Sequence, residues 1–551
     1  MGTRKGFIFT ADAILAFYLI TIMLSVLLLL SYSPRVYADQ SQMLASDILN
    51  VMNNIKMSDL SNDSRFPFSA NLVYMKRNSV SSWSMFLRTP DRNNSVVSVY
   101  PRNASLLWSS GPGLGRGGFT VDSSPIVYNG KVVITSTNGT YLIDENTGYQ
   151  FWYIPIPGIS TPAVSNGRLF IGSTNNIFYS IDEAGNIVWN QTFSGPIISS
   201  PVVHNGKVFF ASMNGNVYAL DQYTGNLTWF FAPPSGNISS SPAVSDNKVF
   251  IISNNGVFYT LDENTGSLLW SYNTTYGPYT RTDVPFEPSP AVANNTVYFA
   301  WTGPFIAFNT TNGKIIWYEF AEIDIYTSSP VIDNDIVYVG QTYGLSSYNA
   351  TNGDYLKQSP SSAIVATPLV TNDSIITVTV DGVLTLRNKS DWSTMWSYDM
   401  NSTVFSSPVL VNGRIYVVTE DGNLFVFGNC SLWDENMSAI ETISAFWLIS
   451  NSLNANASLC AKALAKEMLD SMVPSNYGSE FVIKSRGMSG LNCSGSLSPS
   501  GEDSIYTNDC NKTKYQRILI RDSRYISRVL QRGSTIYYGQ NPLQFELRIW
   551  N

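Results

Sequence analysis

The single histidine of the chain, His204, limits the kinds of catalysis that the sequence can support. A serine triad would have to use His204 as its base, and a multi-histidine metal site needs at least one more. His204 precedes an Asn-Gly pair, at the place held by Tyr128, Ser165 and Val411 in similar stretches. We therefore interpret it as a surface turn residue, and we predict no catalytic residue and no metal site.

A glycine-rich stretch, Gly113 to Gly118, satisfies the pattern Gly-x-Gly-x-x-Gly. A dinucleotide site of this type requires a strand before the glycines and a helix after them. Here the run Phe119-Thr-Val follows, which favours a strand, so we interpret the glycines as a mobile link. The sequence predicts no bound cofactor.

Four cysteines lie near the C-terminus, and none of them forms a Cys-x-x-Cys metal pair: Cys430, Cys460, Cys493 and Cys510. Outside the cytoplasm such residues are expected to form two disulfides. The order along the chain favours Cys430–Cys460 and Cys493–Cys510, although three connectivities are open.

The stretch from Ser199 to Trp229 predicts the element that the rest of the chain repeats. Three β-type runs are separated by turn dipeptides, and a fourth run ends at the tryptophan. Asn-Gly between two such runs predicts a type I′ hairpin turn. The same pattern recurs about every 40 residues, with its proline at positions 125, 162, 201, 242, 290, 330, 368 and 408. Four strands at this spacing predict a β-propeller blade.

The eighth repeat stops after three strands, at Phe427, and its missing strand is expected upstream. Asn103 to Trp108 matches the last strand of the other repeats, so an N-terminal strand would complete the final blade and close the ring. We predict an eight-bladed propeller over residues 103–428. The repeated tryptophans are expected to pack between blades, and the repeated Leu-Asp pairs to form turn hydrogen bonds.

The repeat Ser-Ser-Pro…Asn-Gly…Val-Tyr-Ala-Leu-Asp-x-x-Thr-Gly-x-x-x-Trp resembles that of quinoprotein-dehydrogenase-like (PQQ-like) propellers. The resemblance implies a fold shared by quinone-dependent alcohol dehydrogenases and by non-catalytic scaffolds of bacterial outer-membrane assembly. The quinone enzymes need a calcium site, an aromatic floor and, in many members, a vicinal cysteine pair. Since no cysteine lies in this propeller, we predict that the chain is not an enzyme.

Residues 1–32 predict a transmembrane helix, because Arg4 and Lys5 precede an apolar run that is interrupted only by Asp12. The basic residues place the N-terminus in the cytoplasm and the bulk of the chain outside; a cleaved secretory signal is the rival interpretation. The stretch resembles the start of archaeal type IV pilin-like proteins, which implies cleavage after Gly6 and assembly into a surface filament. Asp12 is then a residue for pairing or assembly, or one that reaches the membrane interface.

The flanks predict an α+β, pilin-like head into which the propeller is inserted. Residues 33–102 would supply a stem helix over 40–60 and strands near 72–75 and 96–100, and residues 429–551 the second part of the head. There we expect helices over 432–453 and 458–472, strands over 481–484, 517–520 and 544–550, and a short helix from Asp522.

Charge is uneven along the chain, whose formal net charge is −7. Residues 103–428 hold 23 acidic and 11 basic residues, so the propeller is expected to repel nucleic acid. The flanks are net basic and suit a membrane with anionic lipids. Asn-x-Ser/Thr sequons predict a glycosylated surface protein, with candidates at Asn138, Asn226, Asn273, Asn309 and Asn349.

The longest link between repeats is the feature that best predicts a binding site. It carries Tyr276, Tyr279, Arg281 and Asp283, and the next link adds Glu319 and Glu322. Aromatic and charged residues on one face of a propeller suit recognition of a carbohydrate or a protein, although a decorated loop without a ligand has the same pattern. The sequence thus predicts a membrane-anchored surface protein for adhesion, cell contact or ligand capture. A scaffold of surface or secretion machinery and a quinone-dependent dehydrogenase are the alternatives.

Overall fold

The computed structural model describes residues 47–60 except 49, 50 and 53, 82–101 except 99, 106–109, 120–274 except 146, 147, 149 and 235, 288–300, 304–320 and 328–428. Between residues 478 and 550 it describes the backbone of eight strands. The chain divides into two compact units, Asn78–Asn429 and Met1–Arg77 with Cys430–Asn551. The predicted membrane helix with Gly6 and Asp12, the predicted helices after the propeller and the four cysteines lie outside the described residues. Within those residues, no helix combines the length and the hydropathy of a membrane span.

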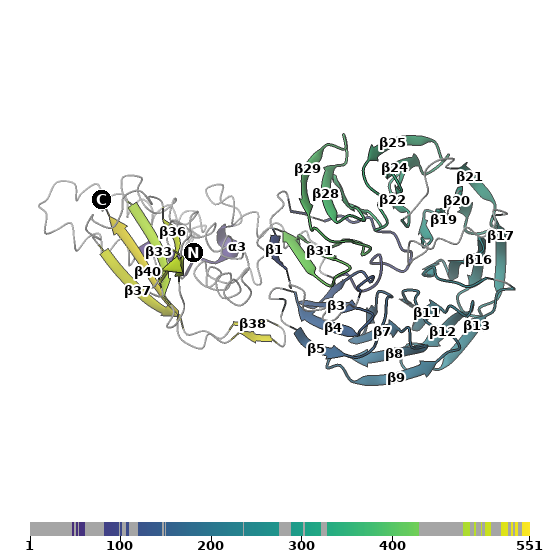
Figure 1. Cartoon of the computed structure of the whole chain (residues 1–551), viewed down its shortest axis with the longest axis horizontal. Helices are drawn as coiled ribbons and strands as arrows, with labels where there is room; N and C mark the ends of the chain where they lie inside the picture. The colour runs from purple at the N-terminus through teal and green to yellow at the C-terminus, as the bar shows by residue number, and fades with distance from the viewer. Residues whose placement is uncertain are drawn as a thin grey trace, which may run out of the picture. The chain divides into compact units, whose positions relative to one another are not determined.

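Eight four-stranded antiparallel sheets form the ring of the first unit (Figure 1). Blades one to four consist of β2 (Ile126–Tyr128), β3 (Lys131–Thr135), β4 (Thr140–Asp144), β5 (Gln150–Ile154); β6 (Ala163–Ser165), β7 (Arg168–Gly172), β8 (Ile177–Asp182), β9 (Ile187–Thr192); β10 (Val202–His204), β11 (Lys207–Ala211), β12 (Val217–Asp221), β13 (Leu227–Phe231); and β14 (Ala243–Ser245), β15 (Lys248–Ile252), β16 (Val257–Asp262), β17 (Leu268–Asn273). Blades five to eight consist of β18 (Ala291–Ala293), β19 (Thr296–Ala300), β20 (Pro304–Asn309), β21 (Ile315–Phe320); β22 (Val331–Asp333), β23 (Ile336–Gln341), β24 (Gly344–Asn349), β25 (Tyr355–Pro360); β26 (Leu369–Val370), β27 (Ser374–Val378), β28 (Val383–Asn388), β29 (Thr394–Asp399); and β30 (Val409–Val411), β31 (Arg414–Val418), β32 (Leu424–Gly428) with β1 (Leu106–Ser109).

The eighth blade joins the two ends of the propeller sequence. Strand β1 pairs antiparallel with β32, where Leu106 lies opposite Phe427 and Trp108 opposite Val426. The predicted closure by an upstream strand is therefore confirmed. Closure gives the last blade the outer strand that its own repeat lacks. The eighth blade therefore has four strands like the others, and the edge of β32 is paired.

Tight turns connect the first two strands of each blade, as the Asn-Gly pairs predict. Asn205 and Gly206 have φ angles of 44° and 77°, and Asn412 and Gly413 have 52° and 71°. Both central residues of a type I′ turn need positive φ, which asparagine and glycine tolerate better than other residues. The turn chemistry of the sequence thus sets the register of these hairpins.

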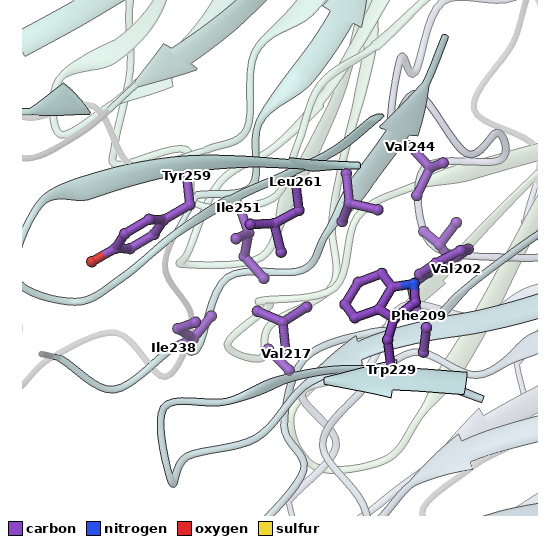
Figure 2. Packing of buried hydrophobic residues seen from close by; sticks show 12 residues of the cluster. Val202, Phe209, Val217, Trp229, Ile238, Val244, Ile251, Tyr259 and Leu261 are labelled. Atoms are coloured by element: carbon purple, nitrogen blue, oxygen red, sulfur yellow. The ribbon is translucent and has the colours of Figure 1, made fainter. Parts of the chain in front are cut away.

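The tryptophans of the outer strands pack against the following blade, as predicted. The indole of Trp229 in β13 lies beneath Gly266, and its Nε1 donates a hydrogen bond to the main-chain oxygen of Glu263 at 2.9 Å. Tyr259 and Leu261 of blade four complete an apolar cluster with blade three (Figure 2). Burial of aromatic and aliphatic surface between neighbouring blades is the main stabilisation available to such a ring.

The contact between blades six and seven departs from this arrangement. Lys357 holds the tryptophan position of β25, opposite Ser347, and Trp392 holds the glycine position of the next turn with a φ of 66°. The Lys357 ammonium donates to the main-chain oxygen of Asp391 at 2.6 Å and lies 5.3 Å from the centre of the Trp392 ring. One indole therefore still fills this contact, but it comes from the following blade.

The second unit contains a sheet of strand order β36-β33-β40-β37, formed by Glu502–Thr507, Gly478–Lys484, Leu543–Trp550 and Ile520–Ile526. Two hairpins accompany it, β34 (Gly490–Leu491) with β35 (Leu497–Ser498) and β38 (Leu530–Arg532) with β39 (Thr535–Tyr537). The strands predicted over 481–484 and 544–550 are confirmed. The helix predicted from Asp522 is wrong, because Asp522 lies in β37 opposite Leu547; pairing with β40 overrides the local capping signal.

Of the predicted stem helix, helix α3 covers Met57–Leu60, and residues 47, 48, 51, 52 and 54 are also helical. The strand predicted over 96–100 is wrong. The only ladder contact recorded beside that range in the described residues is an isolated bridge between Ser95 and Val370 of blade seven. This stretch belongs to the propeller unit, because its polar groups bond the inner strands of the ring and leave no partner strand for a sheet of its own.

Candidate functional site

The propeller has two faces that differ in the connections they carry. The links from each outer strand to the next inner strand lie on one face, with the turns between second and third strands; we call this the link face. The other two sets of turns lie on the opposite, turn face. The predicted site residues Tyr276, Tyr279, Arg281, Asp283 and Glu322 belong to link-face connections but lie outside the described residues. Glu319 is described, half-buried in β21 opposite Phe305.

Residues 83–100, the channel segment, line the centre of the ring and bond one inner strand after another. Trp83 pairs with Val127 of blade one, and the Ser84 carbonyl accepts from Val164 of blade two. Further along, Pro90, Asp91 and Asn94 present their carbonyl oxygens to blades four, five and seven. The inner strands would otherwise expose these N–H groups to the channel, so the segment satisfies buried donors.

Arg92 anchors the channel segment at the centre of the ring. Its side chain is fully buried, and its guanidinium donates to the carbonyl oxygens of Phe86, Ser200, Pro201 and Pro242. Burial lowers the pKa of Arg92 to about 9, an effect that nearby Asp91 partly offsets. The group is still a cation at neutral pH, and the fixed fork of donors matches four main-chain acceptors from two blades and the segment itself.

A ring of hydroxyl groups surrounds the channel on the link-face side of the inner strands. In every blade except blade seven, the second residue of the Ser-Ser-Pro or similar triplet accepts a hydrogen bond from the main-chain N–H of the corresponding residue in the preceding blade. Seven such bonds, of 2.8 to 3.0 Å, join residues of the series Ser124, Thr161, Ser200, Ser241, Ser289, Ser329, Thr367 and Ser407. Each hydroxyl keeps its own hydrogen for a further acceptor.

A cavity of about 50 Å³ lies at this ring. The eight hydroxyl residues line it, together with Phe86 of the channel segment, Asp122, and Pro288, the first described residue after the long insert. Burial, and next the carboxylate of Glu420, raises the pKa of Asp122 to about 6. The mouth of the channel is therefore polar, and its negative charge increases as the pH rises toward neutrality.

His204 has a partner that sequence reasoning missed. It ends β10, about one third exposed, and its Nδ1 lies 2.7 Å from Oε1 of the buried Glu263 in blade four. The prediction of a surface turn residue is wrong in part, because His204 is half-buried and ends strand β10 next to the turn residues Asn205 and Gly206. The pair adds a contact between blades three and four. The repeated aspartates form turn hydrogen bonds, as predicted; Asp221, for example, accepts from the N–H groups of Tyr223 and Thr224.

The sequon asparagines lie on both faces of the propeller. Asn226 and Asn273 are exposed, and Asn138, Asn309 and Asn349 are half-buried. Asn273, Asn309 and Asn349 end strands β17, β20 and β24, where turns were expected. Glycosylation at all five stays a prediction.

The channel segment and the hydroxyl ring were both missed from the sequence. The repeated Ser-Ser-Pro triplet carried a signal for the ring, because hydroxyls recur there at a fixed place in every blade. The channel segment carries no repeat and little periodicity, and only the closed ring shows what it contacts.

A protein-family model described as "Outer membrane protein assembly factor BamB" matches residues 92–197, 140–232, 184–398 and 358–429. Together the matches cover the propeller and the end of the channel segment, and they leave the flanks unmatched. The pilin-like and archaeal resemblance of the flanks therefore gains no support from this match. No curated protein matches the chain.

Solved structures share the fold of the propeller. BamB from Moraxella catarrhalis is 17% identical and covers 56% of this chain and 96% of its own, with a TM-score of 0.48. Quinohemoprotein alcohol dehydrogenases from Pseudomonas putida and Comamonas testosteroni are each 14% identical with TM-scores of 0.54. They cover 65% and 71% of this chain and 82% and 84% of their own. The prediction that the chain is not an enzyme is wrong as an exclusion, because these fold relatives are alcohol dehydrogenases.

A quinone cofactor with its metal ion would need free space and metal ligands at the centre of this ring. Residues 83–100 occupy the channel, and the remaining cavity measures about 50 Å³. Among the residues that the structure describes, no three His, Cys, Asp or Glu side chains converge as metal ligands. The channel as the chain fills it therefore does not fit a tricyclic quinone with its metal.

Proposed function

The chain belongs to the family whose model is described as outer membrane protein assembly factor BamB, and from that premise we propose that its propeller captures a protein or glycan partner on the link face. Residues 1–32 would hold it in a membrane as a pilin-like anchor, with the propeller on the outer side. Adhesion, cell contact and ligand capture are activities that need this arrangement and no reaction.

The observation that carries this proposal is the position of Pro288. The long insert with its tyrosines and Arg281 re-enters the described structure at Pro288, which lines the cavity at the channel mouth. The channel segment forms the base of that cavity through Phe86. A partner would thus meet a polar cavity at Pro288, where the link with aromatic and charged residues rejoins the described chain, and such residues are common at recognition surfaces.

The test replaces Tyr276, Tyr279 and Arg281 by Ala and measures binding of the purified protein to intact cells and to a glycan array. Binding should fall about tenfold or more, equivalent to roughly 1.4 kcal/mol. Tyr223→Ala is the matched control, since Tyr223 is 53% exposed on the turn face. Equal binding by the triple variant and the control, with unchanged melting temperatures, would refute the link-face site.

A scaffold in surface or secretion machinery and a quinone-dependent dehydrogenase share the family fold, and the fold favours neither over capture. Absorbance of the purified protein, followed by a dye-coupled alcohol oxidation assay, separates the dehydrogenase from the other two, because a bound quinone is coloured. Filaments or a multiprotein complex recovered from membranes would support the scaffold.

A further inference from the structure

A polar cavity of about 230 Å³ lies on blade seven, away from the central channel. Its walls are side chains of β28, of β29, of the turn between β27 and β28, and of the link that precedes blade seven. The residues that line it are Ser361, Ser362, Thr379, Asp381, Val383, Thr385, Arg387, Thr394 and Ser397. All but Val383 carry a hydroxyl, a carboxylate or a guanidinium.

The cavity is on the side of the blade that elsewhere packs against the preceding blade. In blade seven Leu386 lies opposite Trp396, whose indole donates to Pro101 on the side of blade eight. Side chains alternate across a strand, so Thr385 and Arg387 face blade six.

The corresponding positions in other blades hold packing residues. In blade four they are Tyr259 and Leu261, which pack with Trp229 of blade three. Blade seven has Thr385 and Arg387 there, and blade six supplies Lys357 in place of a tryptophan. At these positions polar side chains replace apolar ones on both sides of the contact, and a polar space lies there, beside the apolar cluster that includes Tyr338, Ile375 and Trp392.

Several polar groups in this cavity have no partner among the described residues. There, Nε of Arg387 is buried without a hydrogen bond, and this guanidinium bonds only from Nη1 to Oγ1 of Thr394, at 3.1 Å. The hydroxyls of Thr385 and Ser397 make no hydrogen bond within the described part of the chain, and the Thr385 side chain is 94% buried. Burial alone lowers the pKa of Arg387, with no neighbouring carboxylate to offset it. Arg387 is half-buried, and this partly desolvated cation would gain a counter-charge from an anionic ligand.

The two ends of the cavity carry opposite charges. Asp381 lies near one end, where Ser362 donates to its carboxylate at 2.9 Å and Thr379 donates to the other oxygen. Arg387 lies at the other end, and four residues of strand separate it from Val383, about 13 Å. A complementary molecule carries several hydroxyls, which donate to Asp381 and exchange hydrogen bonds with Thr385 and Ser397. It also bears an anionic group that meets the Arg387 fork.

We propose that this cavity, defined by Asp381, Thr385 and Arg387, binds a short acidic glycan whose uronate carboxylate pairs with Arg387. Hydroxyl-rich walls with a carboxylate at one end suit sugar hydroxyls, and the length of the site exceeds one sugar ring. The site is independent of the proposed link-face capture, because it shares no residue with the insert or with the channel mouth.

The experiment titrates the full-length protein with a disaccharide of glucuronate and N-acetylglucosamine by calorimetry, with cellobiose as the neutral analogue. The uronate disaccharide should bind at least tenfold more tightly than cellobiose, equivalent to roughly 1.4 kcal/mol. Arg387→Gln should remove that preference, and Thr385→Val, which keeps the side-chain shape, should weaken both sugars. Arg168→Gln is the matched control, because Arg168 lies over Tyr223 at another blade contact and outside the cavity.

Each outcome decides the proposal. Failure of both sugars to bind, equal affinity for both, or an unchanged preference in a folded Arg387→Gln variant would overturn it. Thermal melting of each variant shows whether it is folded, and Thr385→Val provides the test if the arginine variant unfolds. The link-face triple variant should keep the sugar affinity, so that failure of the glycan site and failure of the capture site are separate results.

Discussion

Two contacts between neighbouring blades differ in the side chains at equivalent positions. These side chains are apolar between blades three and four and partly polar between blades six and seven. At the first, Trp229, Tyr259 and Leu261 form an apolar cluster closed by Gly266. At the second, Lys357 faces Trp392, and a polar cavity lies beside an apolar cluster that includes Tyr338 and Trp392. The backbone of the two blades is the same four-stranded sheet in both cases. The geometry of a blade therefore does not depend on one particular set of side chains at its contact with the next blade. A single contact can carry polar residues that bind a ligand.

The largest difference is expected when the two side chains at the tryptophan position are removed. Trp229→Ala should lower the free energy of unfolding by about 3–5 kcal/mol, because a large buried side chain leaves a cavity. Lys357→Ala should change it by no more than about 1 kcal/mol, as for other solvent-accessible charged contacts. Chemical denaturation of both variants measures this. Equal losses would show that the lysine contact is as strong as the indole contact.

A second difference concerns the glycine that covers the tryptophan. Gly266 has a φ of +70°, and an added Cβ would lie 2.5 Å from the ring of Trp229. Gly266→Ala should cost about 3 kcal/mol, from the left-handed backbone and from overpacking together. Gly206→Ala is the matched control, because Gly206 has a φ of +77° but no atom within 4 Å of the added Cβ. The control should lose only the backbone part, about 1–2 kcal/mol. A control that is as unstable as Gly266→Ala would assign the whole effect to the backbone.

In the contact between blades six and seven, Lys357 holds the tryptophan position and Trp392 holds the glycine position. We therefore expect the effects of substitutions at these two positions on stability to be coupled. Lys357→Trp alone places a second indole against Trp392, and Trp392→Gly alone removes the indole that fills the contact. The double variant restores the arrangement seen at Trp229 and Gly266. A double-mutant cycle on unfolding free energies should therefore give a favourable coupling of about 1–2 kcal/mol. Additive losses would mean that the two positions are independent.

The smallest expected effect is a pH dependence at the polar contact. The hydrogen bond from Thr379, and next the one from Ser362, hold the pKa of Asp381 below its ordinary value of 3.8. A carboxyl group with a lowered pKa stabilises the fold above its unfolded pKa, and this contribution is lost as the pH falls through the folded value. Asp381→Asn should thus melt slightly below the wild type at neutral pH, and the gap should close as the pH falls well below 3.8. The effect is small because solvent screens this exposed side chain. A gap that widens on acidification would contradict the assignment.

The propeller could be derived from the sequence because its signals are local and repeated. Asn-Gly at 205 and 206 defines a turn from two adjacent residues, and the recurring tryptophan marks each outer strand. The error at Asp522 arose where no repeat existed, and pairing with a distant strand determined the structure. The candidate site was harder to predict from the sequence. The insert residues indicated only a composition that suits binding, whereas Pro288 and Phe86 line one cavity only when the ring is closed.

By itself the sequence determined eight blades, their turns, the closing strand and the packing role of the tryptophans. The blades, turns and tryptophan contacts lie within one repeat or between adjacent repeats, so spacing and residue type are sufficient. The closing strand pairs with the far end of the propeller sequence, but its residues match the last strand of the other repeats. Only the tertiary structure showed that residues 83–100 line the channel, that the hydroxyls form a ring and that Nε of Arg387 is buried without a hydrogen bond. These features join residues far apart in the chain: Arg92 reaches Pro242, and Trp396 reaches Pro101. No local pattern records such partners, because the geometry that brings them together exists only in the closed ring.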